Sequence, residues 1–228
     1  MDNSTKTLEK EARLAGFFYL LHILLIIYGV FFVSFKLGIS GTKEMAENII
    51  ANEFLFRTGI VSRIISMIPT LLMALFLYRI LKNVSIQQAR FMFSLILISI
   101  PFQFVAEVFN LTSLMIAKEE LLKSIDSTQR IDFSILFINI YNNMVSIGQM
   151  FWGLWLFPLG LLIYKSKFIL QFFGTILFLG GVGYLIDYVS FLFFPDFRSV
   201  TVIALLMGLV SEISIMLWLL LKGIKNHI

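Results

Sequence analysis

The sequence contains no cysteine, only two histidines (His22 and His227), and only 14% charged residues in a chain of 228. Without cysteine, disulfides, thiol catalysis, iron–sulfur ligation and cysteine-ligated zinc are excluded. Two histidines are too few for a histidine-rich metal site, so we predict neither a metal nor a cofactor. A soluble protein of this size carries about 25% charged residues, and the deficit argues against a soluble fold.

Sequence motifs of catalytic sites are also missing. There is no Gly-x-Ser-x-Gly elbow, no His-Glu-x-x-His, no Glu-x-x-His pair and no phosphate-cradling glycine loop. We therefore predict no catalytic residue. Carboxylates alone can still act as acids and bases, so an intramembrane enzyme is kept as a second alternative for the function.

Hydrophobic residues make up 59% of the chain and form six long runs. About 20 apolar residues cross a hydrocarbon core about 30 Å thick, and uninterrupted runs favour helices over barrel strands. The sequence thus predicts an all-α, polytopic membrane protein whose six helices form one bundle in the lipid bilayer. No polar segment is long enough to bury its own core, so residues 1–228 are expected to form a single domain. The predicted spans are about 14–34, 58–80, 91–116, 135–164, 169–194 and 200–221.

The net charge of +4 is a topology signal and does not indicate a nucleic-acid partner. Basic residues outnumber acidic ones at one set of span ends, whereas the other set is mixed. The first side is predicted to be cytoplasmic, with both termini inside and the chain crossing the cell membrane several times. The bases of that side are Lys6, Lys10, Arg13, Arg79, Lys82, Arg90, Lys165, Lys167, Lys222 and Lys225.

The connection between the first two spans contains an amphipathic stretch at 43–54. Met45, Ile49 and Ile50 could lie on the bilayer surface while the glutamates face water, which would make this segment an interfacial helix. The alternative is an amphipathic connector without that role.

Five ionisable residues are set into the apolar runs, and each costs about 2.5–3.5 kcal/mol to insert on translocon scales for acids and bases. Helical spacing places the intramembrane polar residues on one face of each span, including Tyr19 in the first span and Tyr184 in the fifth, and these faces should point inward. Depth then separates them into two layers. The outer layer contains Arg63, Glu107 and Asp187, and the central layer contains His22, Gln103, Gln149 and Glu212.

In the outer layer we expect Arg63 to pair with Asp187 or Glu107, because the guanidinium fork meets a carboxylate with two hydrogen bonds. Glu212 has no obvious cation beyond His22. It should therefore be neutral, hydrogen-bonded to Gln149 or His22, or wetted by a cavity.

A carboxyl placed like Glu212 could carry protons, so the first functional hypothesis is a small permease or proton-coupled carrier of an unidentified small solute. The alternative is a static network that fixes helix register in a structural or regulatory membrane protein. Such a protein would have a protein partner and no substrate.

Several segments resemble the bacterial and archaeal membrane family catalogued as domain of unknown function 4386. They follow the expected order over nearly the full chain, and the most specific is Gly183-Tyr184-Leu185-Ile186-Asp187. The others are Arg13–Gly16, Asn48–Ala51, Leu55–Arg57, Ala74–Arg79, Phe151–Leu154, Pro158–Gly160, Gly208–Glu212 and Leu217–Leu220. The resemblance implies a prokaryotic integral membrane protein and supplies no activity. Such members usually carry an acidic residue where Arg63 stands.

Overall fold

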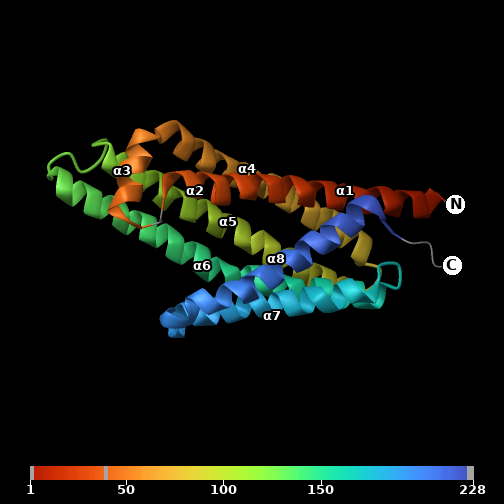
Figure 1. Ribbon diagram of the computed structural model, residues 1–228. Coiled ribbons are helices and arrows are strands. Elements are labelled where there is room, and N and C mark those ends of the chain that lie inside the picture. The colour runs from red at the N-terminus through yellow and green to blue at the C-terminus, as the bar shows by residue number, and fades with distance from the viewer. Residues whose placement is uncertain (1–2, 39–40, 225–228) are drawn as a thin grey trace. The chain divides into compact units, whose positions relative to one another are not determined.

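The computed structural model describes residues 3–38 and 41–224, which form helices and short connections without a strand among them. Lys225 and His227 lie outside the described residues. Figure 1 shows the order of the elements. They are α1 (Asn3–Ile26), the π-helix η1 (Ile27–Phe32), α2 (Val33–Leu37), α3 (Lys43–Ala51), α4 (Glu53–Leu81), α5 (Ile86–Ala117), α6 (Ser127–Ser166), α7 (Gln171–Phe193), the 3-10 turn η2 (Pro195–Phe197) and α8 (Arg198–Leu221).

Six helical stretches of the described chain are long and apolar enough to cross a membrane, which confirms the six predicted spans and the all-α class. The helices extend past the apolar runs, most of all at α6. That helix begins at Ser127 and not near 135, because the Asp126 carboxylate accepts a hydrogen bond from the Gln129 backbone N–H at 2.9 Å and caps the first turn. The six stretches are Lys6–Leu37, Glu53–Leu81, Ile86–Ala117, Ser127–Ser166, Gln171–Phe193 and Ile203–Leu221.

The chain divides into two compact units. Unit 1 comprises residues 1–21, 69–99 and 146–228, and unit 2 comprises residues 22–68 and 100–145. The divisions fall inside α1, α4, α5 and α6, so these four helices each contribute to both units. Prolines stand at or next to two of the divisions, with Pro69 inside α4 and Pro101 inside α5, where each removes a helix hydrogen bond.

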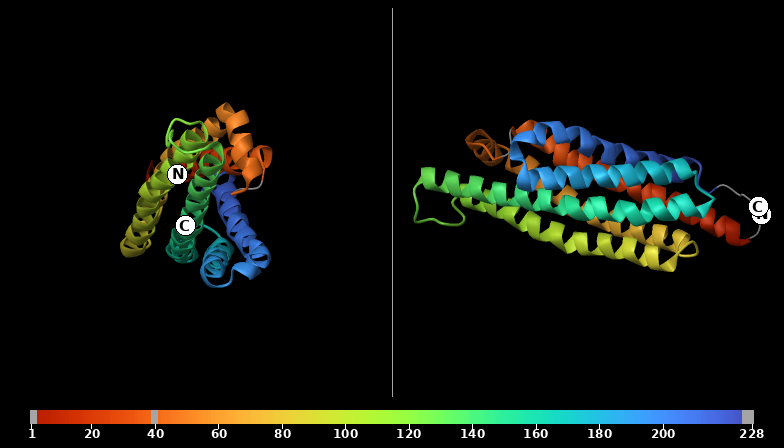
Figure 2. Two further views of the ribbon diagram at one scale, coloured as in Figure 1. Left: turned by 90° about the vertical axis from the view of Figure 1, so that its left-hand side faces the viewer. Right: turned by 90° about the horizontal axis from the view of Figure 1, so that it is seen from below.

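In unit 1, α7 and α8 lie side by side (Figures 1 and 2). Glycines let α6 and α7 approach closely. A Cβ atom on Gly174 would lie 2.6 Å from the Gly160 carbonyl oxygen, and one on Gly160 would lie 2.7 Å from the Gly174 carbonyl oxygen. Small residues at such contacts allow backbones to pack directly, which is the main source of helix attraction inside lipid.

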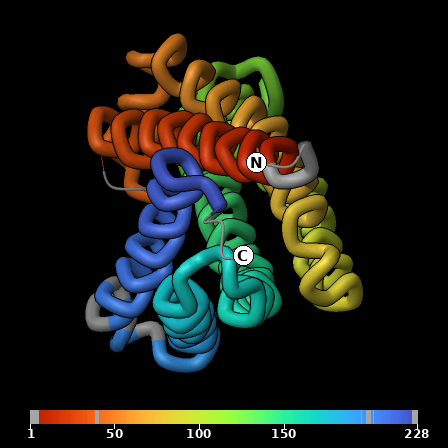
Figure 3. The backbone as a smooth tube through the Cα atoms, turned by 90° about the vertical axis from the view of Figure 1, so that its right-hand side faces the viewer, coloured from red at the N-terminus to blue at the C-terminus, as the bar shows by residue number. Residues whose placement is uncertain are grey.

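The described ends of the chain lie on the same side of unit 1. A Cβ atom on Gly16 of α1 would come within 2.6 Å of the Leu220 nitrogen of α8, and one on Gly223 within 3.2 Å of the Glu9 side chain. Figure 3 shows the end of α8 against α1. Which side of the membrane these ends face stays a prediction from the charges.

In unit 2, α3 begins at the Thr42 hydroxyl, which accepts a hydrogen bond from the Met45 backbone N–H at 3.2 Å. Of the two possibilities for this segment, the burial of Met45 and Ile49 agrees with the amphipathic connector and not with an interfacial helix, although Ile50 is 38% exposed. Met45 and Ile49 are buried in a cluster with apolar residues of α2, α4, α5 and α6, among them Leu37. The apolar face of α3 therefore packs on protein, which hides apolar surface from water as well as lipid does.

A set of ion pairs joins the start of α4 to the end of α5 in unit 2. The Lys118 ammonium lies 2.6 Å from Glu53 and 3.3 Å from Glu120, and Glu53 also accepts from Arg57 at 2.7 Å. The hydrogen bonds to Glu53 and Glu120 raise the pKa of Lys118. These residues lie at helix ends, where long charged side chains can reach water.

Orientation can be measured with single cysteines, because the natural chain has none. We expect cysteine at Lys82 or Lys165 to be protected from a membrane-impermeant maleimide in intact cells. Cysteine at Lys43 or Lys123 should be labelled, and all four should react after the cells are opened. The reverse pattern would overturn the predicted topology.

Substituting Gly174 with alanine should separate α6 from α7, because the added methyl meets backbone atoms that cannot move aside. We expect a loss of about 1–3 kcal/mol in the free energy of unfolding, measured in mild detergent. Thr175→Ala, at the neighbouring exposed position, is the control and should change little. Equal stability of the two variants would contradict the close backbone contact.

Candidate functional site

Within unit 2, polar side chains connect the first membrane-crossing helix to α4. Arg63 of α4 is only 6% exposed and meets Glu107 of α5, which is 3% exposed. The Arg63 Nε donates to Glu107 Oε1 at 2.6 Å, and its Nη2 donates to Oε2 at 2.9 Å. This is the two-bond fork that makes arginine a strong partner for a carboxylate. Of the two partners considered for Arg63, Glu107 is the one that the structure places against it.

The third nitrogen of the Arg63 guanidinium donates to backbone. Its Nη1 donates to the Gly29 carbonyl oxygen at 2.5 Å, and Gly29 lies in the π-helix η1. A Cβ atom on Gly29 would lie 2.8 Å from the Arg63 Cγ, so only glycine lets the arginine stem pass. A short π-helix inside an α-helix often marks a functional position, and here it is where the helix meets the guanidinium.

Two further side chains complete what we call the Arg63 cluster (Gly29, Arg63, Glu107, Asn110 and Tyr141). The Asn110 amide donates to Glu107 Oε2 at 3.3 Å. The Arg63 Cζ lies 5.4 Å from the centre of the Tyr141 ring, in cation–π range. Each contact in the cluster stabilises the charge of Arg63 or of Glu107. The cluster therefore suits a structural role, in which it joins the first crossing helix to α4, α5 and α6.

Three more hydrogen bonds join the first crossing helix to α4 near the Arg63 cluster in the sequence. They link Ser62 Oγ to the Leu25 carbonyl oxygen (2.8 Å), His22 Nδ1 to the Ser66 carbonyl oxygen (3.4 Å), and the Tyr28 and Thr58 hydroxyls (2.8 Å). His22 is thus placed against backbone of α4, and both of these residues belong to unit 2.

Unit 1 contains a second group of polar side chains, which differs in its charge balance. The Tyr19 hydroxyl of α1 donates to Glu212 Oε2 of α8 at 2.6 Å, and the Tyr184 hydroxyl of α7 also hydrogen-bonds Glu212. Glu212 is partly exposed, and among the described residues no Lys, Arg or His forms an ion pair with it. Among the described residues, the hydrogen-bond partners of the Glu212 carboxyl are therefore hydroxyls and include no cation.

Aromatic rings surround these hydroxyls. The Tyr19 and Trp155 ring centres lie 6.3 Å apart, and the Trp152 and Tyr184 centres are also 6.3 Å apart at an edge-on angle. We call Tyr19, Trp152, Trp155, Tyr184 and Glu212 the Glu212 cluster. Glycine again makes the room, because a Cβ on Gly208 would lie 2.5 Å from the Tyr184 ring. Gly208 stands one helical turn before Glu212, so Tyr184 can lie across α8 beside the carboxyl.

The other predicted polar residues have separate surroundings. Asp187 is buried and accepts a hydrogen bond from the Thr201 hydroxyl at 2.5 Å. Gln103 of unit 2 and Gln149 of unit 1 are both buried, at 8% and 6% exposure. The Gln103 Nε2 and the Gln149 Oε1 have no hydrogen-bond partner among the described residues.

Sequence reasoning missed that tyrosines are the partners of Glu212. Tyr19 and Tyr184 were both placed on inward polar faces, and that was the available signal. Two pockets of unit 1 are lined by residues other than Glu212. One follows α1 from Lys6 to Phe17, and the other lies between α6 and α7 around Gly160 and Gly174.

The fold defines a helical protein with membrane-crossing segments. The chain belongs to the family described as Domain of unknown function (DUF4386), which matches residues 14–223 and confirms the resemblance seen in the sequence. It is also similar to an uncharacterized protein of Archaeoglobus fulgidus, at 28% identity over 88 residues, which is 39% of this chain and 51% of that protein. The chain therefore spans about half the length of the curated relative it matches. No solved structure matches the chain significantly.

Removing one member of the Arg63–Glu107 pair should strongly destabilise the fold. Glu107→Gln leaves a buried guanidinium without its counter-charge, and we expect a loss of about 3–5 kcal/mol in the free energy of unfolding. The double variant Arg63→Gln/Glu107→Gln should recover much of it, because no unpaired charge remains. Denaturation in mixed micelles measures both.

The control for that measurement is Glu47→Gln, which removes an ion pair with Lys43 whose two side chains are 59% and 72% exposed. Surface pairs contribute little, so this variant should stay close to the natural chain. A Glu107→Gln protein as stable as Glu47→Gln would contradict a dry, charge-compensated pair.

Proposed function

We propose that the chain is a proton-coupled carrier of a small solute in the cell membrane, and that Glu212 is the group that binds the proton. The observation that carries the proposal is the setting of Glu212. It lies in a membrane-crossing helix, two tyrosine hydroxyls contact it, and no ion pair neutralises it among the described residues.

The chemistry of the two partners supports a proton-binding role. A tyrosine hydroxyl can donate or accept a hydrogen bond. The ionised carboxylate can accept from both Tyr19 and Tyr184, and the neutral acid can donate to one of them while accepting from the other. The cluster can therefore stay hydrogen-bonded in both protonation states, whereas a Glu held by arginine loses its attraction when it is protonated.

Membrane depth supports the same role. Acidic residues inside membrane segments are rare, face the protein interior, and recur in the proton relays of pumps and transporters. Glu212 as a whole residue is partly exposed, in contrast to the nearly sealed Glu107. The archaeal relative agrees with a prokaryotic source for the chain.

Proton movement can be measured without knowing the solute. The full chain is reconstituted into liposomes that enclose a pH-sensitive dye, and the pH of the outside buffer is changed in one step. Valinomycin and potassium balance the charge that the protons carry across the membrane. We expect the natural chain to move protons faster than empty liposomes, alone or after addition of small-solute mixtures. Glu212→Gln should fall to the rate of empty liposomes.

Glu212→Gln is suitable because the amide oxygen can still accept the Tyr19 hydrogen bond, so the fold should persist. Tyr164→Phe is the matched control, since it removes an exposed tyrosine hydroxyl outside the Glu212 cluster and should leave the flux unchanged. Equal proton flux in folded Glu212→Gln and natural protein would overturn the proposal.

The closed Arg63 cluster favours a second candidate function, a structural or regulatory membrane protein without a substrate. Its charges are satisfied by its own members and by backbone. On this reading the Glu212 cluster also fixes helix register. Glu212→Gln would then change stability or assembly alone, as measured by unfolding and by size-exclusion chromatography, and no solute would alter proton flux.

A further inference from the structure

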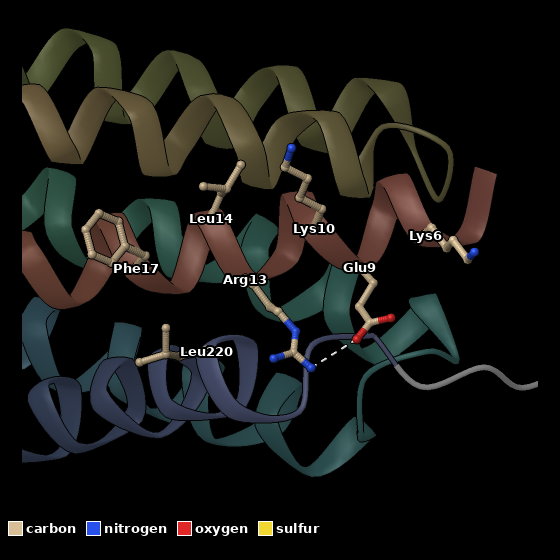
Figure 4. A pocket seen from close by; sticks show the side chains of 7 residues that line it. All are labelled: Lys6, Glu9, Lys10, Arg13, Leu14, Phe17 and Leu220. Atoms are coloured by element: carbon tan, nitrogen blue, oxygen red, sulfur yellow. Dashed lines mark hydrogen bonds and ion pairs between the residues drawn. The ribbon is translucent and has the colours of Figure 1, made fainter. Parts of the chain in front are cut away.

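A pocket of about 500 Å³ lies in unit 1, along α1 and beside the end of α8. Figure 4 shows its lining side chains, most of them on α1 and Leu220 on α8. The α1 residues 6, 10, 13 and 17 follow the helical repeat, so they share one face of the helix. The lining is Lys6, Glu9, Lys10, Arg13, Leu14, Phe17 and Leu220.

Charge in this pocket is concentrated at one end. Arg13 is paired with Glu9 at 3.0 Å, the dashed contact in Figure 4. Lys6 and Lys10 are exposed, and neither forms an ion pair with another described residue. One acid thus faces three bases, which leaves an excess of positive charge at the start of α1.

The other end of the pocket is apolar. Leu14 and Leu220 line it, and Phe17 is 49% exposed. Leu21, one turn further along the same face of α1, is 37% exposed and extends the apolar surface. From Lys6 to Phe17 the helix rises roughly 16 Å, at about 1.5 Å per residue. The bases can therefore stand at headgroup level while Phe17 reaches the hydrocarbon.

We propose that this pocket binds an anionic glycerophospholipid. Lys6 and Lys10 would hold the phosphodiester, and one acyl chain would lie over Leu14, Phe17 and Leu220. The occupant is identified by the change from charged to apolar lining along one helix face, which matches the order of headgroup and acyl chain in a lipid. Clusters of bases beside a membrane span are the sequence feature that attracts anionic lipids. The inference is independent of the proposed carrier function.

The test is a lipid titration of the full chain in an uncharged detergent. Native mass spectrometry counts bound dioleoylphosphatidylglycerol and, separately, dioleoylphosphatidylcholine. We expect tighter binding of the anionic lipid, weakened by added salt. Lys6→Gln/Lys10→Gln should lower the affinity for phosphatidylglycerol about 30-fold, because each base near the surface contributes about fivefold. Binding of phosphatidylcholine should not change.

The matched control is Lys165→Gln/Lys167→Gln, which removes the same charge from two exposed lysines outside the pocket. It should keep the affinity of the natural chain. Equal loss in both double variants would overturn the proposal in favour of a diffuse charge effect. Competition by inorganic phosphate, or by glycerophosphoglycerol without acyl chains, would overturn it in favour of a soluble-anion site.

Discussion

Lipid supplies no hydrogen-bond partner, so a polar group inside the membrane must be satisfied by the protein itself. The Arg63–Glu107 pair is the most demanding case in this chain, because both charges are almost fully buried in unit 2. Several features of the local structure meet at this pair. Glycine at position 29 leaves room for the Arg63 side chain, and the first crossing helix is π-helical there. Asn110 contacts Glu107, and the Tyr141 ring lies near the Arg63 guanidinium.

The two polar clusters satisfy their buried polar groups in different ways. In the Arg63 cluster a cation and an anion compensate each other, and any change of protonation would leave a charge unpaired. In the Glu212 cluster the hydrogen-bond partners of the carboxyl within the described part of the chain are hydroxyls, and these tolerate either protonation state. This difference is why the proposed function centres on Glu212, while the Arg63 cluster is better suited to fixing helices α4, α5 and α6.

The spans were predictable because lipid demands length and hydrophobicity, and both can be read along the chain. Helical spacing also predicted which faces are polar, including those with Tyr19, Tyr184 and Glu212. It could not predict which faces meet, because a stripe on one helix carries no information about its neighbour. The π-helix at Gly29, whose carbonyl oxygen accepts a hydrogen bond from Arg63 of another helix, was not predicted either.

The α3 segment illustrates a second limit of sequence reasoning. The sequence left open whether Met45 and Ile49 lie on the bilayer or belong to a connector, and both are buried in protein. Burial in lipid and burial in a protein core select the same side chains, so the amphipathic pattern of α3 could not distinguish them. The partnered Thr42 cap, by contrast, follows from local chemistry and is visible in the sequence.

Infrared spectroscopy of the membrane-reconstituted chain, titrated over pH, tests the central claim most directly. The account predicts a carboxylic-acid C=O band that disappears as the pH rises, is absent in Glu212→Gln, and persists in the folded Tyr164→Phe control. A band that is unchanged in Glu212→Gln would contradict it. The account would also be contradicted if no Glu212-dependent band were found at any pH at which the protein stays folded.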